Sequence, residues 1–372
     1  MNEIAKNEAL FLPFMQIPTG HHHVADALMY DLEKNITCDK VDILSYSYGK
    51  AEGLVSSAYL KWIEVLPGAY DWLYCFLASK QLPKRNRQFI YEALFNYFFK
   101  KLVKEYDPTI MFFTHCLPSN IASILKQKRK LNAVTVNVYT DYFVNRVWGV
   151  EGIDYHLVPS LDVKKFLLQS GVKEDRIFLT GIPVHPAFRS GPVQSEVKNQ
   201  LNVLVTGGSL GVGAIDKLLP DKTDNSAINY YVLCGKNQAL YRQLRSKNSA
   251  NITPIPYVKS KEKMNILYDQ ADAVITKPGG VTVSECLIKQ KPIFVSDALP
   301  GQEKINLDRL MQMGLIIPID LQADSVEEQI INFFADEAMR KRYDERLHEY
   351  HCNLDKRPIQ EIMGKIMNIK QH

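Results

Sequence analysis

The sequence predicts an α/β protein built from two doubly wound, Rossmann-like domains whose parallel sheets face a shared cleft. Strand-like and helix-like segments alternate along both halves of the 372-residue chain, and a polar stretch with no periodicity separates the halves. A chain of this length is too long for one ordinary core, which favours two domains. We expect domains at residues 1–187 and 201–350, a linker at 188–200 and a C-terminal helix at 351–372.

The first half contains apolar segments that we interpret as strands. They are residues 11–17, 41–47, 109–115, 133–141, 154–160 and 176–183. Residues 109–115 and 133–141 are rich in β-branched and aromatic side chains, as is typical of buried parallel strands. Residues 24–35 have a helical apolar period. Residues 119–130 form a second expected helix with Ser119 as its N-cap.

The second half repeats this alternation. Strands are expected at residues 201–208, 227–235, 251–258, 271–280 and 291–297. Helical segments separate them, and residues 323–349 and 354–369 are expected to close the fold as helices rich in Lys, Arg and Glu.

Residues 55–105 interrupt the alternation with a dense set of aromatic and basic side chains. An amphipathic stretch of this kind is typical of a segment that lies on an anionic membrane surface. A helical hairpin with its aromatics in the core and its lysines in water explains the same composition. The pattern leaves both interpretations open.

Composition excludes several other classes of protein. The chain is 46% apolar and 23% charged, which indicates a folded protein rather than a disordered one. Its net charge of +4 is too small to indicate a nucleic-acid partner. We see no signal peptide, no apolar run long enough to span a bilayer and no CxxC pair among the six cysteines, so we expect a cytoplasmic protein with reduced thiols.

Two glycine turns, at residues 206–213 and 277–282, follow expected strands of the second half. Ligands of doubly wound sheets bind outside the carboxyl ends of the strands. Glycine lets the backbone approach an oxyanion closely, and a helix N-terminus adds free N–H groups. A single glycine turn between a strand and a helix is also required for packing alone. Two such turns in one domain favour a diphosphate site.

Polar side chains beside these turns complete a candidate nucleotide-sugar site. Glu285 follows the second turn and is suited to accept hydrogen bonds from ribose hydroxyls, although an acid near a helix start is favourable anyway. Gln302 and Glu303 suit the hydroxyls of a sugar. Lys277 either neutralises phosphate or is an ordinary surface lysine.

Four motifs make the chain resemble glycosyltransferase family 28, nearest to its bacterial diacylglycerol glucosyltransferases and plant monogalactosyldiacylglycerol synthases. They are TDYFVNRVW (140–148), LTGIPVHPAF (179–188), KPGGVTVSE (277–285) and PGQEKIN (300–306). The similarity runs from about residue 11 to about residue 320. It implies the GT-B fold, an inverting transfer and a UDP-hexose donor, with glucose as the expected sugar.

The resemblance also implies a role for each donor-binding residue. The diphosphate is expected at Gly207, Gly208, Ser209, Gly279, Gly280, Val281 and Thr282, the uracil at Tyr257 and Val258, the ribose at Glu285, and the sugar at Gln302 and Glu303.

For the acceptor side, His23 resembles the family histidine that deprotonates the attacking hydroxyl, after the loop that begins at Gly20. His21 and His22 stand where the family usually has small residues. Asp141 either assists this base or caps a helix. Further candidates for the acceptor side are His22, His115, Arg146 and His185. Three adjacent histidines also suggest a metal site as an alternative. Consecutive side chains diverge, however, and no acidic or Cys cluster accompanies them, so we rank metal binding below the transferase loop.

The expected function is therefore transfer of a hexose from a UDP-sugar to diacylglycerol, without a metal or other cofactor. The expected location is the inner face of the cell membrane, as a peripheral protein. Two alternatives stay open: a transferase for another acceptor, such as a natural product or a peptidoglycan precursor, and a non-catalytic UDP-sugar sensor.

Overall fold

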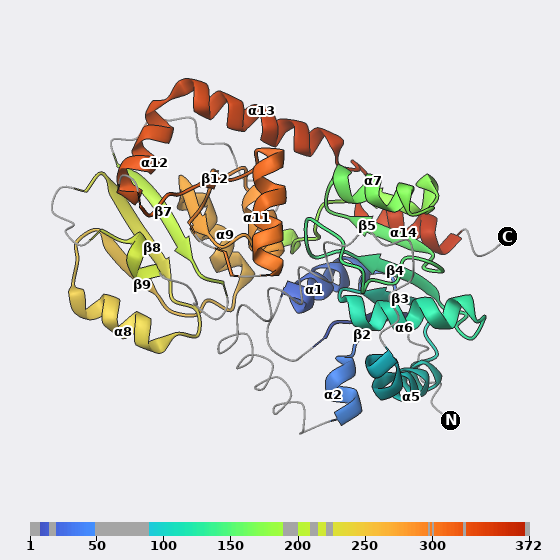
Figure 1. Ribbon diagram of the computed structural model, residues 1–372. Coiled ribbons are helices and arrows are strands. Elements are labelled where there is room, and N and C mark those ends of the chain that lie inside the picture. The colour runs from blue at the N-terminus through green and yellow to red at the C-terminus, as the bar shows by residue number, and fades with distance from the viewer. Residues whose placement is uncertain are drawn as a thin grey trace. The chain divides into compact units, whose positions relative to one another are not determined.

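The computed structural model divides the chain into two compact units (Figure 1). Unit 1 comprises Met1–Pro186 together with Asn353–His372, and unit 2 comprises Ala187–Cys352. The structure describes residues 8–14, 20–48, 89–188, 200–208, 215–220, 226–296, 298–299, 301–322 and 325–368. Most of the expected linker therefore lies outside the described residues.

Unit 1 contains a six-stranded parallel sheet in the order β2-β1-β3-β4-β5-β6 (Figure 1). Its strands are β1 (Ala9–Leu12), β2 (Cys38–Lys40), β3 (Ile110–Phe113), β4 (Val134–Val138), β5 (Tyr155–Val158) and β6 (Ile177–Leu179). Apart from β2, these strands are buried along their whole length, which explains why each reads as an apolar run. The predicted doubly wound parallel architecture is confirmed.

Helices flank this sheet. They are α1 (Gly20–Leu32), α2 (Ile43–Tyr48), α5 (Phe89–Tyr106), α6 (Cys116–Gln127), α7 (Leu161–Gln169) and α14 (Ile359–Asn368), with the 3-10 turn η2 (Glu174–Arg176). A second 3-10 turn, η3 (Pro186–Phe188), stands at the boundary between the two units along the chain.

The strand expected at residues 41–47 is wrong. The chain forms β2 just before it and then turns into α2, where the Asp42 carboxylate accepts a hydrogen bond of 2.9 Å from the Ser45 backbone N–H. An aspartate that bonds a backbone N–H three residues later starts a helix, and this local bond outweighs the β-like composition.

Helix α5 covers the last part of the aromatic segment at residues 55–105, and residues 55–88 lie outside the described residues. Phe95, Phe99 and Leu102 are buried in the core of unit 1. The exposed side of the helix carries Tyr97, which is 70% exposed, together with Lys100, Lys101 and Lys104. For α5, packed aromatics and solvated lysines occupy opposite faces.

The N-cap expected at Ser119 is also wrong. Helix α6 begins one turn earlier, at Cys116, and the side chain of His115 accepts the capping hydrogen bond. Ser119 is fully buried, and its hydroxyl donates to Asn137 Oδ1 at 2.7 Å. Asn137 Nδ2 donates in turn to the Gly149 carbonyl at 2.7 Å, so this network fixes the loop after β4 against α6.

Unit 2 contains a second six-stranded parallel sheet, in the order β12-β11-β10-β7-β8-β9 (Figure 1). Its strands are β7 (Leu201–Thr206), β8 (Ile228–Leu233), β9 (Ile252–Ile255), β10 (Ala273–Thr276), β11 (Ile293–Val295) and β12 (Ile317–Pro318). Its helices are η4 (Ile215–Leu218), α8 (Gln238–Lys247), α9 (Lys261–Gln270), α10 (Gly280–Ile288), α11 (Gln302–Met313), α12 (Val326–Ala335) and α13 (Glu337–Asn353). Only β12 was not expected, because two residues are too few to form a pattern.

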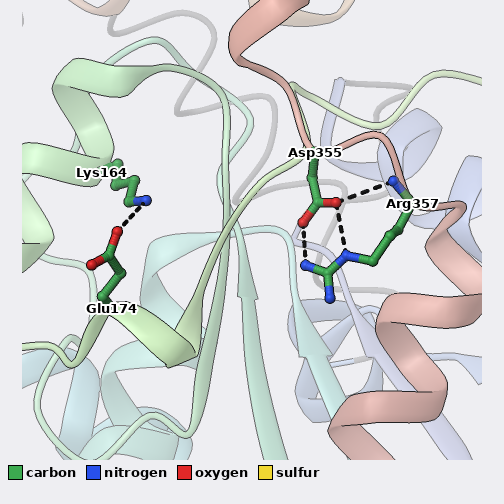
Figure 2. Close-up of polar contacts among 4 residues, drawn as sticks. All are labelled: Lys164, Glu174, Asp355 and Arg357. Carbon is green, nitrogen blue, oxygen red and sulfur yellow. Dashed lines mark hydrogen bonds and ion pairs between the residues drawn. The ribbon is translucent and has the colours of Figure 1, made fainter.

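After α13 the chain returns to unit 1, where Figure 2 shows Asp355 and Arg357 bonded to each other. Asp355 accepts hydrogen bonds from Arg357, and the Asp355 backbone N–H donates to the Leu179 carbonyl of β6 at 2.7 Å. Nearby, Lys164 of α7 bonds Glu174 at 2.8 Å. Helix α14 packs on α1, where Gln360 donates to the buried Asp31. The C-terminal segment is therefore part of unit 1.

Among the helices that the structure describes, none combines the length and the apolar character needed to cross a membrane.

Candidate active site

Each sheet reverses its strand order at one point, and the candidate residues gather there. In unit 1 the reversal lies between β1 and β3, which are followed by the first turns of α1 and α6. In unit 2 it lies between β7 and β10, which are followed by the two glycine turns. In open parallel sheets such a point leaves a crevice at the carboxyl ends of the strands, where ligands bind.

At the unit 2 reversal, the backbone N–H groups offered to a prospective anion are those of the first turn of α10. The Gly208 N–H donates to the Thr206 hydroxyl at 3.1 Å, and the Gly279 N–H donates to the Lys277 carbonyl at 2.8 Å. Gly208 has a φ of +75° and Gly279 has a φ of −79°, and a Cβ built on either meets no atom within 4 Å. Gly279 is the N-cap of α10 and supplies no side-chain cap, so the first N–H groups of that helix keep their anion-binding capacity. Gly280, Val281 and Thr282 form the first turn of α10, and Gly207 directly follows β7.

Ser209 lies outside the described residues. The described residues after the first glycine turn form the 3-10 turn η4 and include no α-helix before β8. A helix dipole is therefore evident only at the second turn.

Lys277 and Glu303 come together at the same edge of the sheet. Lys277 follows β10, Glu303 is the second residue of α11, and Lys277 Nζ lies 3.7 Å from Glu303 Oε2. The carboxylate also accepts a hydrogen bond of 2.7 Å from the Leu299 backbone. The Lys277 ammonium is buried and has no hydrogen bond to any described residue, which leaves its donors available to a ligand. Gln302 begins α11 beside this pair.

Glu285 lies buried in the second turn of α10. Its Oε2 accepts a hydrogen bond of 2.9 Å from the Tyr268 hydroxyl, and Lys261 Nζ lies 4.0 Å from Oε1. Burial raises the pKa of Glu285, while Lys261 and the Tyr268 hydroxyl act in the opposite direction. Tyr268 and Lys261 were not expected in the site, because both come from α9 and no sequence pattern links them to Glu285.

The end of the motif at residues 179–188 packs beside these groups. The Phe188 ring contacts Tyr268 at 5.7 Å, and Lys261 Nζ lies 5.6 Å from the Phe188 ring centre. Tyr257 and Val258 are half-buried after β9, where Lys236 Nζ lies 5.9 Å from the Tyr257 ring centre. Lys236 follows β8, and Tyr257 and Val258 follow β9, its neighbour in the sheet.

At the unit 1 reversal, His21 contacts groups that follow two strands, β3 and β4. Its Nδ1 lies 2.6 Å from the Thr114 carbonyl oxygen and 3.2 Å from the Thr140 hydroxyl. Its ring meets that of His115 edge to face, with centres 4.8 Å apart. Burial lowers the pKa of His21, and the Asp141 carboxylate opposes this effect. His21 is therefore a central residue that the sequence did not single out as catalytic.

The structure gives each of the other acceptor-side candidates a different setting in unit 1. His22 Nε2 lies 3.6 Å from Asp42 Oδ2, and His23 is half-buried in the first turn of α1, which begins at Gly20. Arg146 Nη2 is buried without a hydrogen bond to a described residue. His185 lies apart from them, against Tyr30 near the other end of α1, with ring centres 4.7 Å apart.

Two doubly wound units, each with a six-stranded parallel sheet, are the arrangement of the GT-B fold. The solved structure of MurG from Acinetobacter baumannii has the same fold, with a TM-score of 0.59 over 97% of this chain and 99% of that one at 13% identity.

Sequence comparison identifies the family. The monogalactosyldiacylglycerol (MGDG) synthase family matches residues 21–184, and the glycosyltransferase family 28 C-terminal domain matches residues 202–297. The uncharacterized glycosyltransferase YkoN of Bacillus subtilis is 42% identical over 96% of each chain. The processive diacylglycerol beta-glucosyltransferase of the same organism is 26% identical over 80% of this chain and 84% of its own. The chain is a sugar transferase of glycosyltransferase family 28, as its motifs predicted, and its first half matches the MGDG synthase family.

Proposed function

We propose that this transferase moves a hexose, with glucose as the expected sugar, from a UDP-sugar to the free hydroxyl of diacylglycerol. The observation that carries the donor assignment is the pair of open glycine turns at the unit 2 reversal, beside the buried ammonium of Lys277. The similarity to diacylglycerol beta-glucosyltransferases over most of the chain supports the acceptor assignment.

Each part of the donor has a matching group in unit 2. The diphosphate lies at the N-terminus of α10, where free N–H groups stabilise the charge that develops on the leaving group. Glu285 accepts hydrogen bonds from the ribose hydroxyls through the oxygen that Tyr268 does not occupy. Gln302 and Glu303 bind sugar hydroxyls at the start of α11. Backbone dipoles and Lys277 take the role of a metal, so the reaction proceeds without one.

The acceptor hydroxyl is activated in unit 1. The Thr114 carbonyl accepts a hydrogen bond from His21 Nδ1, which leaves Nε2 as the basic nitrogen. In the transfer, the hydroxyl proton moves to this nitrogen, the oxygen bonds the anomeric carbon, and the bond to UDP breaks with its electron pair on the phosphate oxygen. Asp141 stabilises the imidazolium that forms. This geometry favours His21 as the base over His23, which the sequence pattern named.

The lipid acceptor requires contact with a membrane. The exposed face of α5 combines Tyr97 with three exposed lysines, Lys100, Lys101 and Lys104. A basic face with an aromatic ring binds anionic lipid surfaces, and each lysine contributes about 1 kcal/mol. We assign this face to the membrane and the enzyme to the inner leaflet as a peripheral protein.

Turnover of UDP-glucose with diacylglycerol in mixed micelles, in the presence of EDTA, tests the proposal. We expect a hexosyl-diacylglycerol of inverted configuration, and loss of about 100-fold or more in His21→Ala with a smaller effect in His23→Ala. Full activity of His21→Ala refutes the base assignment, and collapse of activity with EDTA alone refutes a metal-free reaction. Transfer only to other acceptors refutes the lipid assignment.

A further inference from the structure

The imidazole rings of His21 and His115, at the unit 1 reversal, carry their hydrogen on different nitrogens. His21 Nδ1 lies 2.6 Å from the Thr114 carbonyl oxygen, which only accepts hydrogen bonds. The hydrogen of a neutral His21 ring therefore sits on Nδ1, and its Nε2 is an acceptor.

His115 has the reverse arrangement. Its Nδ1 accepts a hydrogen bond of 3.2 Å from the Leu117 backbone N–H, which only donates. The hydrogen of a neutral His115 ring therefore sits on Nε2. Burial lowers the pKa of His115 well below its ordinary value, and the neighbouring His21 adds to this effect, so the ring is neutral at physiological pH.

The His115 ring is also held in position. It stacks on Phe14 with ring centres 4.7 Å apart and meets His21 at an interplanar angle of 86°. No described residue hydrogen-bonds Nε2 of either ring. An acceptor nitrogen and a donor N–H thus stand on adjacent, fixed rings, both available to a ligand.

The chemistry of the transfer decides how such a pair is used. The attacking oxygen needs a lone pair for the anomeric carbon, and a hydrogen bond donated to that oxygen makes it less nucleophilic. The donor N–H is therefore best used on a second oxygen. Glycerides and sugars carry such an oxygen on the carbon next to the one that bears the reacting hydroxyl.

We infer that His115 selects the acceptor. Its Nε2–H donates to an oxygen on the carbon next to the one that bears the hydroxyl deprotonated by His21. The inference rests on the proposed function and narrows it to acceptors with two oxygens on neighbouring carbons. His115 thereby acts as a specificity-determining and positioning residue.

Two variants separate this role from the structural roles of the ring. His115→Ser keeps an N-cap for α6 and loses the ring, whereas His115→Phe keeps the stacking on Phe14 and loses the cap. Both lack the Nε2–H. We compare kcat/KM for 1,2-diacylglycerol with that for a long-chain primary alcohol that has no oxygen on the neighbouring carbon, both in the same micelles.

We expect the preference of the native enzyme for diacylglycerol over the alcohol to fall by about tenfold in both variants. An unchanged preference in either variant overturns the inference, and so does a loss confined to the variant without the cap. If the native enzyme glycosylates neither compound, the proposed function itself fails.

A readout that needs no activity accompanies this assay. Nitrogen-15 NMR of the ring nitrogens is expected to show the hydrogen on Nδ1 of His21 and on Nε2 of His115. The opposite tautomer at His115 overturns the inference even if sugar transfer is confirmed.

Discussion

Replacement of Gly279 by alanine tests whether this glycine is needed for ligand binding or for folding. Gly279 has φ −79° and ψ 133°, which any residue adopts, and a Cβ built there meets no atom within 4 Å. A glycine replaced at a compatible position gains about 0.4–1 kcal/mol from the unfolded state. Loss of a glycine N-cap offsets part of that gain, so folding stability is expected to change by less than about 1 kcal/mol.

Donor binding is expected to respond differently. The added methyl group occupies open space at the start of α10, where we place the diphosphate. Loss of one hydrogen bond to a charged group costs about 1.5–3 kcal/mol. This corresponds to a UDP dissociation constant about 10- to 100-fold weaker in Gly279→Ala.

Titration calorimetry with UDP, together with thermal unfolding, measures both quantities. Gly364→Ala is the matched control, because Gly364 lies in α14 of unit 1 and its Cβ also meets no atom within 4 Å. Native-like UDP affinity in Gly279→Ala contradicts the assignment of the diphosphate to this turn. A large loss of stability in that variant contradicts the structural argument.

Three further predictions concern single residues. Gly149→Ala is expected to destabilise unit 1 by about 1–3 kcal/mol, because the new Cβ clashes with the Ser119 carbonyl and the Ser123 Cβ. Chemical denaturation measures this loss, and a variant as stable as the native protein contradicts the close packing at Gly149. Ser119→Ala leaves its buried partner Asn137 short of a hydrogen bond and is expected to cost about 1–3 kcal/mol, and a cost near zero argues against the network. Since burial raises the pKa of Glu285 and ribose binding needs its ionised form, the affinity for UDP-glucose, whose diphosphate has no second ionisation near neutral pH, is expected to fall as the pH is lowered from about 7 to about 5. Glu285→Gln should remove that pH dependence, and its persistence in the variant places the titrating group elsewhere.

The buried strands of both sheets were predictable because strands buried in a parallel sheet are continuous apolar runs, whereas the half-buried β2 and the two-residue β12 were not predicted. Residues 133–141 and 201–208 show this, since β4 and most of β7 are buried. Residues 41–47 were misassigned because a single hydrogen bond from Asp42 to the backbone decides in favour of α2. Two-residue β12 has too little pattern to be recognised.

The candidate site was predictable where a local motif carries the chemistry. The glycine turn at residues 277–282 follows from sequence alone. The partners of Glu285 did not, because Tyr268 and Lys261 reach it from α9 only in the folded state. His21 was not chosen as the base for the same reason: its tautomer depends on the Thr114 carbonyl, 93 residues away in sequence. The helix expected within residues 354–369 is present as α14, but its packing on α1, more than 300 residues away in sequence, has no local signal.

The most direct test of the account is a product assay with the full chain, a panel of UDP-hexoses and 1,2-diacylglycerol in anionic mixed micelles, with EDTA present. Mass spectrometry of the lipid fraction is expected to show a hexosyl-diacylglycerol, formed most rapidly from UDP-glucose. The proposed function is contradicted if no donor gives a glycosylated lipid, whether the sugar is transferred to another acceptor or not at all.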